Sequence, residues 1–304
     1  MKKFSLSLNR TLKIPVIQYG NGTPRIFIIS GIHGDEDSGP LVLSLLMDKL
    51  NHLKISGTIT LIPIANTEAI AIKSRLNPID NKDLNREFGN LGNKTHTTMI
   101  AKLIAEIAMT HNLIIDIHTF PNQISPIVGV LLSEGGQEIR EVSEKLLNLF
   151  QPEIIWNLDS KKTEIGKAGS ICSLAITNNL PAFGIELPPN YFLSGKNIQK
   201  FLHGFLNIFA EMGIIPIAKR KITKTEIEHF ERQMFRSIAE GYFFPEKNIM
   251  SNVQKNDLIG FMLALETNEK IKIFSPFKGI LLSVSHPRLI KKGEKVFVVG
   301  EKVK

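Results

Sequence analysis

The feature that most constrains the fold is an alternation of short apolar runs with longer helical patterns between residues 13 and 187. The short runs are rich in β-branched residues and almost continuously apolar, which is typical of central strands covered on both faces of a sheet. The predicted strands are Arg25–Ser30, Gly57–Ile64, Leu113–His118, Ile127–Leu132 and Ala182–Leu187. This alternation predicts an α/β fold with a mixed, largely parallel sheet.

The segments between these runs have the periodicity of helices. Met99, Leu103, Ile104 and Ile107 have the spacing i, i+4, i+5, i+8, which predicts that they share the buried face of one helix. The predicted helices are Ser38–Leu53, Thr95–Thr110, Glu138–Phe150 and Gly195–Met212. Helices that alternate with the strands in this way would flank the predicted sheet.

After about Ile222 the helical periodicity stops, and short apolar runs follow one another with turn residues between them. These runs are Phe243–Pro245, Leu258–Leu265, Ile271–Phe274, Ile280–Val284 and Val296–Val299. Short strands at nearly regular spacing predict a small all-β module. We therefore expect two domains, residues 1–222 and 223–304, with the basic segment 218–225 as the linker between them.

Charge and composition limit the classes of partner. The formal net charge is +8, but the basic residues are scattered, which predicts a solvated lysine-rich surface and no nucleic-acid partner. The chain has no apolar run of membrane-spanning length and no signal-peptide pattern. Its single cysteine, Cys172, excludes an intrachain disulfide. We expect a cytoplasmic protein without a membrane partner, and the sequence leaves open whether it is a homo-oligomer.

The first motif with chemical potential is the hexapeptide GIHGDE at residues 31–36, directly after the strand Arg25–Ser30. Binding sites of open α/β sheets form beyond the carboxyl ends of strands, where this motif lies. His33 and Glu36 are three residues apart and can converge on one ion. Two histidines and a glutamate, with a fourth position left for water, form a catalytic zinc set. Alone, however, such a pair is also common at protein surfaces.

A second motif is Asp-Ile-His at the end of the strand Leu113–His118. Asp116 and His118 are two residues apart and therefore share one face of the strand. An imidazole at this position is either a metal ligand or a core histidine bonded to the backbone. The flanking carboxylate is consistent with a group that orients a metal-bound histidine, and also with a simple ion pair.

A third motif places Glu186 at the end of the apolar strand Ala182–Leu187. A carboxylate in this position is costly to bury unless something pairs with it. A general base beside a metal-bound water is one such use, and an ordinary strand-end glutamate is the alternative.

A fourth motif is the polar segment that contains Asn66, Arg75, Asp80 and the tetrapeptide Asp83–Arg86. Its adjacent Asn85 and Arg86 can hold a carboxylate, because a guanidinium offers two parallel donors and the amide adds another. A solvated polar loop is the alternative interpretation.

Together these motifs resemble the succinylglutamate desuccinylase and aspartoacylase family, a branch of the zinc carboxypeptidase superfamily. The matching segments, in the family's order and spacing, are GIHGDEDSGP, NTEAIAIKSRLNPIDNKDLNREFG, DIHT and GIEL. The C-terminal part is also similar to the family's β domain. The resemblance implies a zinc-carboxypeptidase-like mixed sheet flanked by helices, with a smaller C-terminal all-β domain of the barrel-sandwich type.

The resemblance also implies a metal site. His33, Glu36 and His118 would bind one Zn²⁺ ion per subunit. Asp83 would orient a zinc-bound histidine from behind, and the spacing of Asp116 from His118 is consistent with the same task. Zinc lowers the pKa of a bound water to about 7, which provides a nucleophile at neutral pH.

For the reaction itself, the resemblance implies that Glu186 acts as general base on this water and then as proton donor to the leaving amine. Arg75 would polarise the scissile carbonyl and stabilise the negative charge that develops on its oxygen. Asn85 and Arg86 would hold a carboxylate of the substrate. A small anionic N-acyl amino acid is therefore the implied substrate class.

Two departures from the family pattern bear on the substrate. The family usually continues as NRxFPG, whereas here Arg86 is followed by the tetrapeptide EFGN at residues 87–90. Zinc carboxypeptidases carry a tyrosine some twenty residues before the base, and none of Tyr19, Tyr191 and Tyr242 lies there. The missing tyrosine favours small N-acyl amino acids over peptides.

The predicted function is hydrolysis of the amide bond of an N-acyl amino acid, with a succinyl, acetyl or similar acyl group. The alternatives are a metallocarboxypeptidase or peptidoglycan-type amidase with the same site, and a zinc-binding or carrier protein without catalysis. The carrier hypothesis draws on Lys270, whose hairpin resembles the modified lysine hairpin of lipoyl domains. Its neighbours Glu269 and Ile271 depart from the carrier pattern, which favours an ordinary turn lysine.

Overall fold

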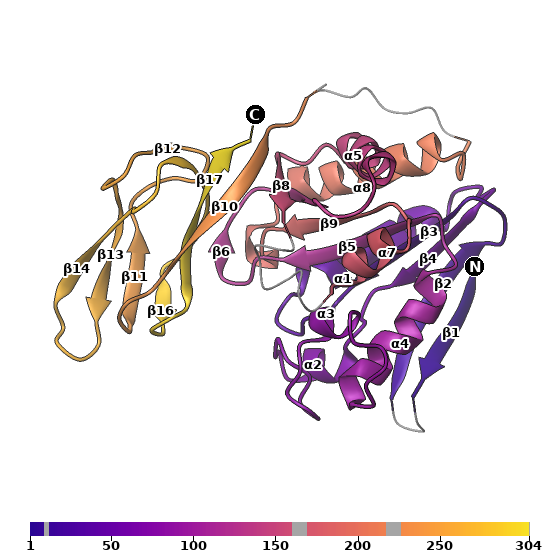
Figure 1. Cartoon of the computed structure of the whole chain (residues 1–304), viewed down its shortest axis with the longest axis horizontal. Coiled ribbons are helices and arrows are strands. Elements are labelled where there is room, and N and C mark those ends of the chain that lie inside the picture. The colour runs from indigo at the N-terminus through magenta and orange to yellow at the C-terminus, as the bar shows by residue number, and fades with distance from the viewer. Residues whose placement is uncertain (9–11, 160–168, 217–225, 304) are drawn as a thin grey trace.

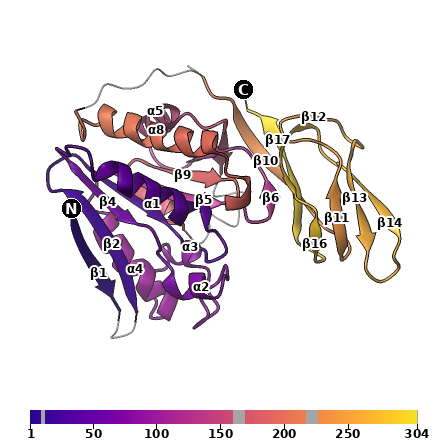
Figure 2. The ribbon, with the colours of Figure 1, turned by 180° about the vertical axis from the view of Figure 1, so that it is seen from behind.

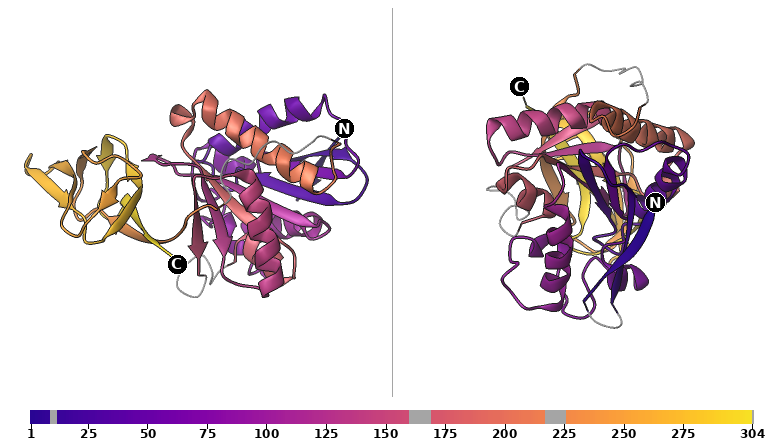
Figure 3. Two further views of the ribbon diagram at one scale, coloured as in Figure 1. Left: turned by 90° about the horizontal axis from the view of Figure 1, so that it is seen from above. Right: turned by 90° about the vertical axis from the view of Figure 1, so that its right-hand side faces the viewer.

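The computed structural model describes residues 1–8, 12–159, 169–216 and 226–303. It shows a larger α/β part that contains the N-terminus and a smaller all-β part to one side of it (Figures 1 and 2). The view from above shows the smaller part as a separate lobe (Figure 3). The predicted linker at residues 218–225, with the predicted domain boundary, lies outside the described residues.

The larger part consists of a mixed sheet and helices on both of its faces. Its strands are β1 (Lys2–Ser7), β2 (Lys13–Gly20), β3 (Arg25–Ser30), β4 (Thr58–Ile62), β5 (Leu113–Thr119), β7 (Val128–Leu132), β8 (Ile154–Leu158) and β9 (Ala182–Leu187). Its helices are α1 (Ser38–Leu50), α2 (Thr67–Ala71), α3 (Leu84–Glu87), α4 (His96–Ala108), α5 (Gln137–Phe150), α7 (Ile171–Thr177), α8 (Gly195–Glu211) and the 3-10 turn η1 (Asn190–Phe192). The predicted fold class is confirmed.

The central strands β4, β3, β5 and β9 run parallel to one another, and β7 is antiparallel to β9. Because β3, β5 and β9 are adjacent and parallel, their carboxyl ends meet at one edge of the sheet. This edge is where the sequence motifs at residues 31–36, 116–118 and 186 lie. Both faces of these strands are buried, as their continuous apolar character predicted.

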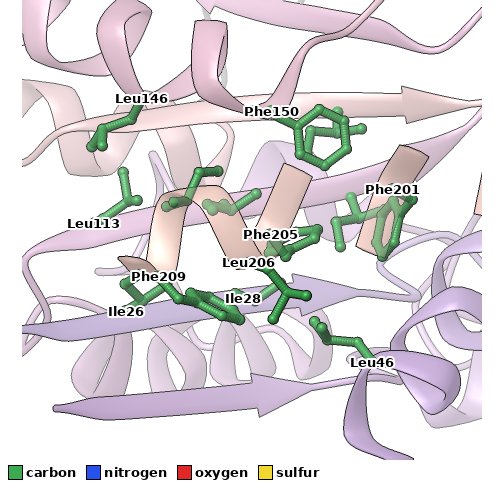
Figure 4. Packing of buried hydrophobic residues seen from close by; sticks show 14 of the residues in the cluster. Ile26, Ile28, Leu46, Leu113, Leu146, Phe150, Phe201, Phe205, Leu206 and Phe209 are labelled. Carbon is green, nitrogen blue, oxygen red and sulfur yellow. The ribbon is translucent and has the colours of Figure 1, made fainter. Parts of the chain in front are cut away.

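Each face of the sheet packs against its own set of helices. On one face, Ile26 and Ile28 of β3 belong to the same apolar cluster as Phe201, Phe205 and Phe209 of α8 (Figure 4). Helices α1 and α5 complete this layer. On the other face, the alternate residues of β3 pack with α4 and α7. Full burial of each such aromatic side chain contributes about 2–3 kcal/mol relative to its exposure.

Within the described ranges, no helix has both the length and the apolar character needed to cross a membrane.

The main sheet continues into the C-terminal part. Its strands are β10 (His229–Arg236), β11 (Gly241–Pro245), β12 (Asn252–Val253), β13 (Leu258–Ala264), β14 (Lys270–Phe274), β15 (Gly279–Ser285), β16 (Arg288–Ile290) and β17 (Lys295–Lys302). Strand β10 pairs in parallel with β8 and antiparallel with β17, so hydrogen bonds connect the two parts. The short strand β6 (Gln123–Ile124) makes a second connection by pairing with β15. The C-terminal lobe is thus an extension of the main sheet.

A second sheet, in the order β14-β13-β11-β16, lies against this extension. Phe243, Ile259 and Met262 from it pack with Val296 and Phe297 of β17 in a separate core. The predicted small all-β module is confirmed. Lys270 begins β14, and its ammonium lies 3.7 Å from the centre of the Phe261 ring.

Candidate metal centre and active site

The first site element is the loop that leaves β3. Gly31 has a φ of 62°, a left-handed conformation that glycine adopts at little cost. Gly34 donates its backbone N–H to the Ser74 carbonyl at 2.8 Å, and a methyl group built on Gly34 would lie 2.1 Å from the Ala69 carbonyl. The small residues therefore let the loop pass close to the neighbouring segment, so that His33 and Glu36 turn inward on either side of Gly34.

We expect Gly34→Ala to destabilise the protein by about 1–3 kcal/mol, because the added methyl group must displace backbone atoms. The displacement would also move His33 relative to Glu36 and weaken metal binding. Denaturant unfolding of the metal-free protein and zinc titration would measure the two effects. Gly92→Ala is the matched control, since a methyl group there meets no atom within 4 Å. A stability equal to that of the Gly92 variant would contradict the prediction.

Three buried side chains converge at the edge of the sheet. His33 Nδ1 lies 2.7 Å from Glu36 Oε1, and His118 Nδ1 lies 2.9 Å from Glu36 Oε2. One donor atom from each of the three side chains lies within 4.8 Å of the other two. The backbone N–H of Thr119 also donates to Glu36 Oε2 at 3.0 Å and helps to fix the carboxylate.

A second carboxylate contacts each imidazole at the ring nitrogen that does not face Glu36. His33 Nε2 lies 2.9 Å from Asp83 Oδ1, and His118 Nε2 lies 2.9 Å from Asp116 Oδ2. Such partners hold a ring in one orientation and leave its other nitrogen available to a metal. Two imidazole nitrogens and a carboxylate, oriented in this way, match a His₂Glu zinc set. The residues present therefore fit a zinc ion.

The electrostatics of this cluster favour positive charge. Burial opposes the imidazolium form of His33 and His118, but Glu36 together with Asp83 and Asp116 raises the pKa of both histidines. Burial alone would raise the pKa of Glu36, yet the two imidazoles hold it well below its usual range. A group of buried carboxylates around two imidazoles attracts protons or a cation.

Arg75 reaches the same cluster from the loop after α2. Its Nη2 donates to Asp83 Oδ2 at 3.0 Å, and its Nη1 lies 3.5 Å from Glu36 Oε1. The side chain of Arg75 is 42% exposed, so the guanidinium is accessible from the solvent side of the site. Asn66 helps to fix the position of this loop, because its side chain accepts a hydrogen bond from Asn77 at 3.0 Å. Asn66 thus belongs to the scaffold of the site.

Asn85 and Arg86 lie on the short helix α3. Asp83 caps this helix by accepting the backbone N–H of Asn85 at 2.9 Å. The amide of Asn85 lies 3.3 Å from His118 Nε2, and Arg86 Nη1 donates to the Asn85 carbonyl at 2.9 Å. The same aspartate therefore contacts His33 and positions the helix that presents the two residues.

Glu186 lies directly beside His118 in the register of the parallel pair β5 and β9. Burial raises the pKa of Glu186, although the nearby charge of His118 opposes that shift. A cavity of about 670 Å³ opens over these side chains. Of the nine site residues predicted from the sequence, Asp116 lies behind His118, and the cavity is lined by the other eight: His33, Glu36, Arg75, Asp83, Asn85, Arg86, His118 and Glu186.

The sequence interpretation missed the other wall of this cavity. Arg232, Met234 and Arg236 of β10 and Lys295 of β17 line it from the C-terminal part. A signal was present, since Arg232 and Arg236 alternate with Met234 along one face of a strand. The sequence does not show which part of the protein this face of the strand contacts. Its basic residues could therefore not be linked to the site motifs.

A mixed sheet with helices on both faces carries a His–Glu–His cluster at the carboxyl ends of its parallel strands, which defines the α/β class of this protein and its site. The chain belongs to the succinylglutamate desuccinylase/aspartoacylase family, because the model of that family's catalytic domain matches residues 22–212. The family predicted from the four motifs is confirmed.

The individual relatives and solved structures have low sequence identity to this chain. The N-alpha-acetyl-L-2,4-diaminobutyric acid deacetylase of Halomonas elongata is 24% identical over 199 residues, which are 63% of this chain but only 57% of that protein. Two solved structures share the fold with TM-scores of 0.82. A succinylglutamate desuccinylase/aspartoacylase from Rhodobacter sphaeroides is 20% identical, with coverage of 99% of this chain and 95% of that chain. The product-bound ectoine utilization protein EutE (DoeB) from Ruegeria pomeroyi is 21% identical, with coverage of 98% and 93%.

Proposed function

We propose that the chain is a zinc-dependent deacylase that hydrolyses the amide bond of a small N-acyl amino acid. The observation that carries this proposal is the convergence of His33, Glu36 and His118 in a cavity that Glu186 also lines. The family and the name of the Halomonas elongata relative, a deacetylase of an N-acetyl amino acid, support the same class of reaction.

In this proposal, His33, Glu36 and His118 hold one zinc ion per subunit, and Asp83 and Asp116 keep the two imidazoles oriented toward it. When bound, zinc supplies Lewis acidity, which lowers the pKa of a water to about 7 and polarises the substrate carbonyl. The mutual distances of the donor atoms and the carboxylates behind the imidazoles support this assignment.

Glu186 accepts a proton from the attacking water and returns it to the amine nitrogen as the carbon–nitrogen bond breaks. The products are a carboxylate and a free amino acid. A raised pKa suits this task, because the group must accept a proton in one step and release it in the next. Arg75 donates to the carbonyl oxygen, where negative charge develops. Asn85 and Arg86 hold a carboxylate of the substrate.

The shape of the cavity favours a small substrate over a peptide. Its volume of about 670 Å³ is within the usual range for small-molecule sites. The C-terminal part forms one of its walls through β10 and β17, whereas a carboxypeptidase or peptidoglycan amidase needs a groove for a long chain. This wall supports the deacylase hypothesis.

The test is a screen of the zinc-loaded protein with N-succinyl, N-acetyl and N-formyl amino acids, with release of free amine as the readout. We expect release from at least one acyl class and none from peptides of the same amino acids. Amine release from peptides alone would support the peptidase alternative. Zinc binding without any hydrolysis would support a zinc-binding or carrier protein. Either of these two results would overturn the proposed function.

A further inference from the structure

The second sheet of the C-terminal part, in the order β14-β13-β11-β16, has one face in the core of the lobe and one face in contact with solvent. On β11, Phe243 is buried in this core, whereas Tyr242 and Phe244 point to the other side and are 47% and 38% exposed. On β14, Ile273 is buried and Phe274 is 46% exposed. Strand β14 lies at the end of the lobe that is remote from the larger part (Figures 1 and 2).

The strand register arranges the outward residues in two rows that run across the sheet. The first row contains Leu289, Tyr242, Leu263 and Lys270, and the second row contains Phe244, Phe261 and Lys272. We call these seven residues the outer face. The rings of Phe244 and Phe261 are stacked, with 5.0 Å between their centroids. Each row is therefore apolar on the inner strands and ends in a lysine on the edge strand β14.

The outer face leaves a continuous apolar surface in water. At about 150–250 Å² for a whole aromatic side chain, the exposed fractions of Tyr242 and Phe244 correspond to about 60–120 Å² each. Leu289, which is 38% exposed, and Phe274, which follows Lys272 on the same side of β14, add to this surface. The total is on the order of 300–400 Å², a size at which patches on monomeric proteins are often functional.

Two carboxylates lie at the ends of the aromatic pair of β11. The Leu265 N–H donates to the Glu240 carbonyl at 3.1 Å, and the Glu246 N–H donates to the Ile259 carbonyl at 2.8 Å. These bonds continue the pairing of β11 with β13 by one residue at each end. Because side chains alternate along a strand, Glu240 and Glu246 point to the same side as Tyr242.

The charges on this side of the sheet have no opposite charge beside them. Both glutamates are exposed, and so is Lys272. Among the residues that the structure describes, none of the three forms an ion pair. The ammonium of Lys270 lies 3.7 Å from the centre of the Phe261 ring. The surface thus carries both signs of charge, with the carboxylates in line with β11 and the lysines on β14.

This arrangement is complementary to itself. Strands β11 and β14 are the two neighbours of β13, so a two-fold axis along β13 would place β14 of each copy over β11 of the other. Lys272 of one copy would then face Phe244 of the other, with Glu246 in the next outward position of β11. Outward positions are about 7 Å apart along a strand, which is within reach of a lysine side chain. Lys270 would meet Tyr242 and Glu240 in the same way.

We propose that the outer face is the interface of a symmetric dimer of this chain, in which the two second sheets stack with β13 along the two-fold axis. Four strands of this length span roughly 15–20 Å in each direction, which is at the small end of specific interfaces and implies a dimer that dissociates at micromolar concentrations. None of the seven residues lines the cavity, so the proposal does not depend on the reaction.

The charges favour a second copy over a lipid surface. An anionic membrane would attract Lys270 and Lys272, but it would repel Glu240 and Glu246 at the two ends of the same surface. In the dimer, each of these charges instead approaches an opposite charge, and each lysine also lies over an aromatic ring.

Sedimentation velocity of the whole chain over about 1–200 µM tests the proposal. We expect the wild type to pass from monomer to dimer in this range, and Phe244→Ser to raise the dissociation constant of the dimer at least about tenfold. A wild type that remains monomeric throughout would overturn the proposal, as would a dimer that Phe244→Ser does not weaken.

An exchange of charges tests the arrangement itself. Glu246→Lys and Lys272→Glu each bring like charges together across the two-fold axis, so each variant alone should dimerise about tenfold more weakly than the wild type. An equal mixture of the two variants pairs unlike charges at both symmetric positions. Its dissociation constant should return to within about threefold of the wild-type value. A mixture that dimerises no better than the single variants would overturn the proposed arrangement.

Two controls accompany these measurements. Lys13→Glu reverses the charge of an exposed strand lysine in the larger part and should dimerise as the wild type does. Zinc titration shows that the variants are folded, because neither Glu246 nor Lys272 lines the cavity and both variants should keep the wild-type affinity. Flotation with phosphatidylserine vesicles examines the other occupant. Vesicle binding by a monomer, abolished by Phe244→Ser, would assign the face to lipid and overturn the dimer.

Discussion

Glu186→Gln is expected to reduce kcat by about a thousandfold while zinc remains bound. The amide has nearly the shape of the carboxylate, but it cannot accept a proton from the attacking water or return one to the leaving amine, and general acid–base catalysis contributes about 10²–10⁴-fold. Glu186 is outside the cluster of donor atoms formed by His33, Glu36 and His118, so metal affinity should change little. Steady-state kinetics and elemental analysis for zinc would measure both quantities.

Glu231→Gln provides the control, because Glu231 is an exposed neighbour of Arg232 on the other face of β10. This variant should retain wild-type kinetics. If Glu186→Gln retained activity within about tenfold of the wild type, another group would have to act as the base. An unchanged physiological role in the absence of turnover would favour the carrier alternative.

His118→Ala is expected to weaken zinc binding by more than about a hundredfold, and activity should be lost with the metal. Changes in residues that merely support a ligand cost 10–100-fold, and loss of a ligand itself should cost more. The substitution also leaves the buried Asp116 without its imidazole partner, 2.9 Å away in the wild type, which should destabilise the metal-free protein by about 1–3 kcal/mol. Competition with a chelator would measure zinc affinity, and denaturant unfolding would measure stability.

His52→Ala is the corresponding control, since His52 is exposed and lies outside the cluster. It should match the wild type in zinc affinity and stability. Zinc affinity of His118→Ala equal to that of the wild type would remove His118 from the ligand set. Glu186→Gln and His118→Ala thus separate catalysis from metal binding, with metal retention expected for the first variant and metal loss for the second.

The central part of the fold was predictable because its strands are buried on both faces. The predicted Arg25–Ser30 and Ala182–Leu187 coincide with β3 and β9, since short and largely apolar runs are typical of strands covered on both faces. Strand β10 was missed, because one of its faces carries Arg232 and Arg236 and its sequence does not show the expected apolar character. Its place in the sheet depends on pairing with β8, a tertiary contact that leaves no local pattern.

The same distinction applies to the site. His33 follows β3, and His118 and Glu186 lie at the carboxyl ends of β5 and β9, so their convergence was predictable from the rule that sites form beyond the carboxyl ends of such strands. Arg232 and Lys295 reach the cavity only because Phe230 pairs with Trp156 and the sheet then continues into β17. No sequence motif indicates this strand register. The basic residues of the cavity wall could therefore be found only from the structure.

The parallel pairing of β8 with β10 has a consequence for how the protein can be divided. A shortened chain that stopped before β10 would keep the metal cluster but expose the backbone donors and acceptors of β8 along an open edge. Exposed edges of this kind recruit strands from other molecules, and such a fragment would tend to aggregate. The C-terminal lobe therefore covers the edge of β8 and also forms a wall of the cavity. A change that removes this lobe would alter both the tendency to aggregate and the binding of substrate.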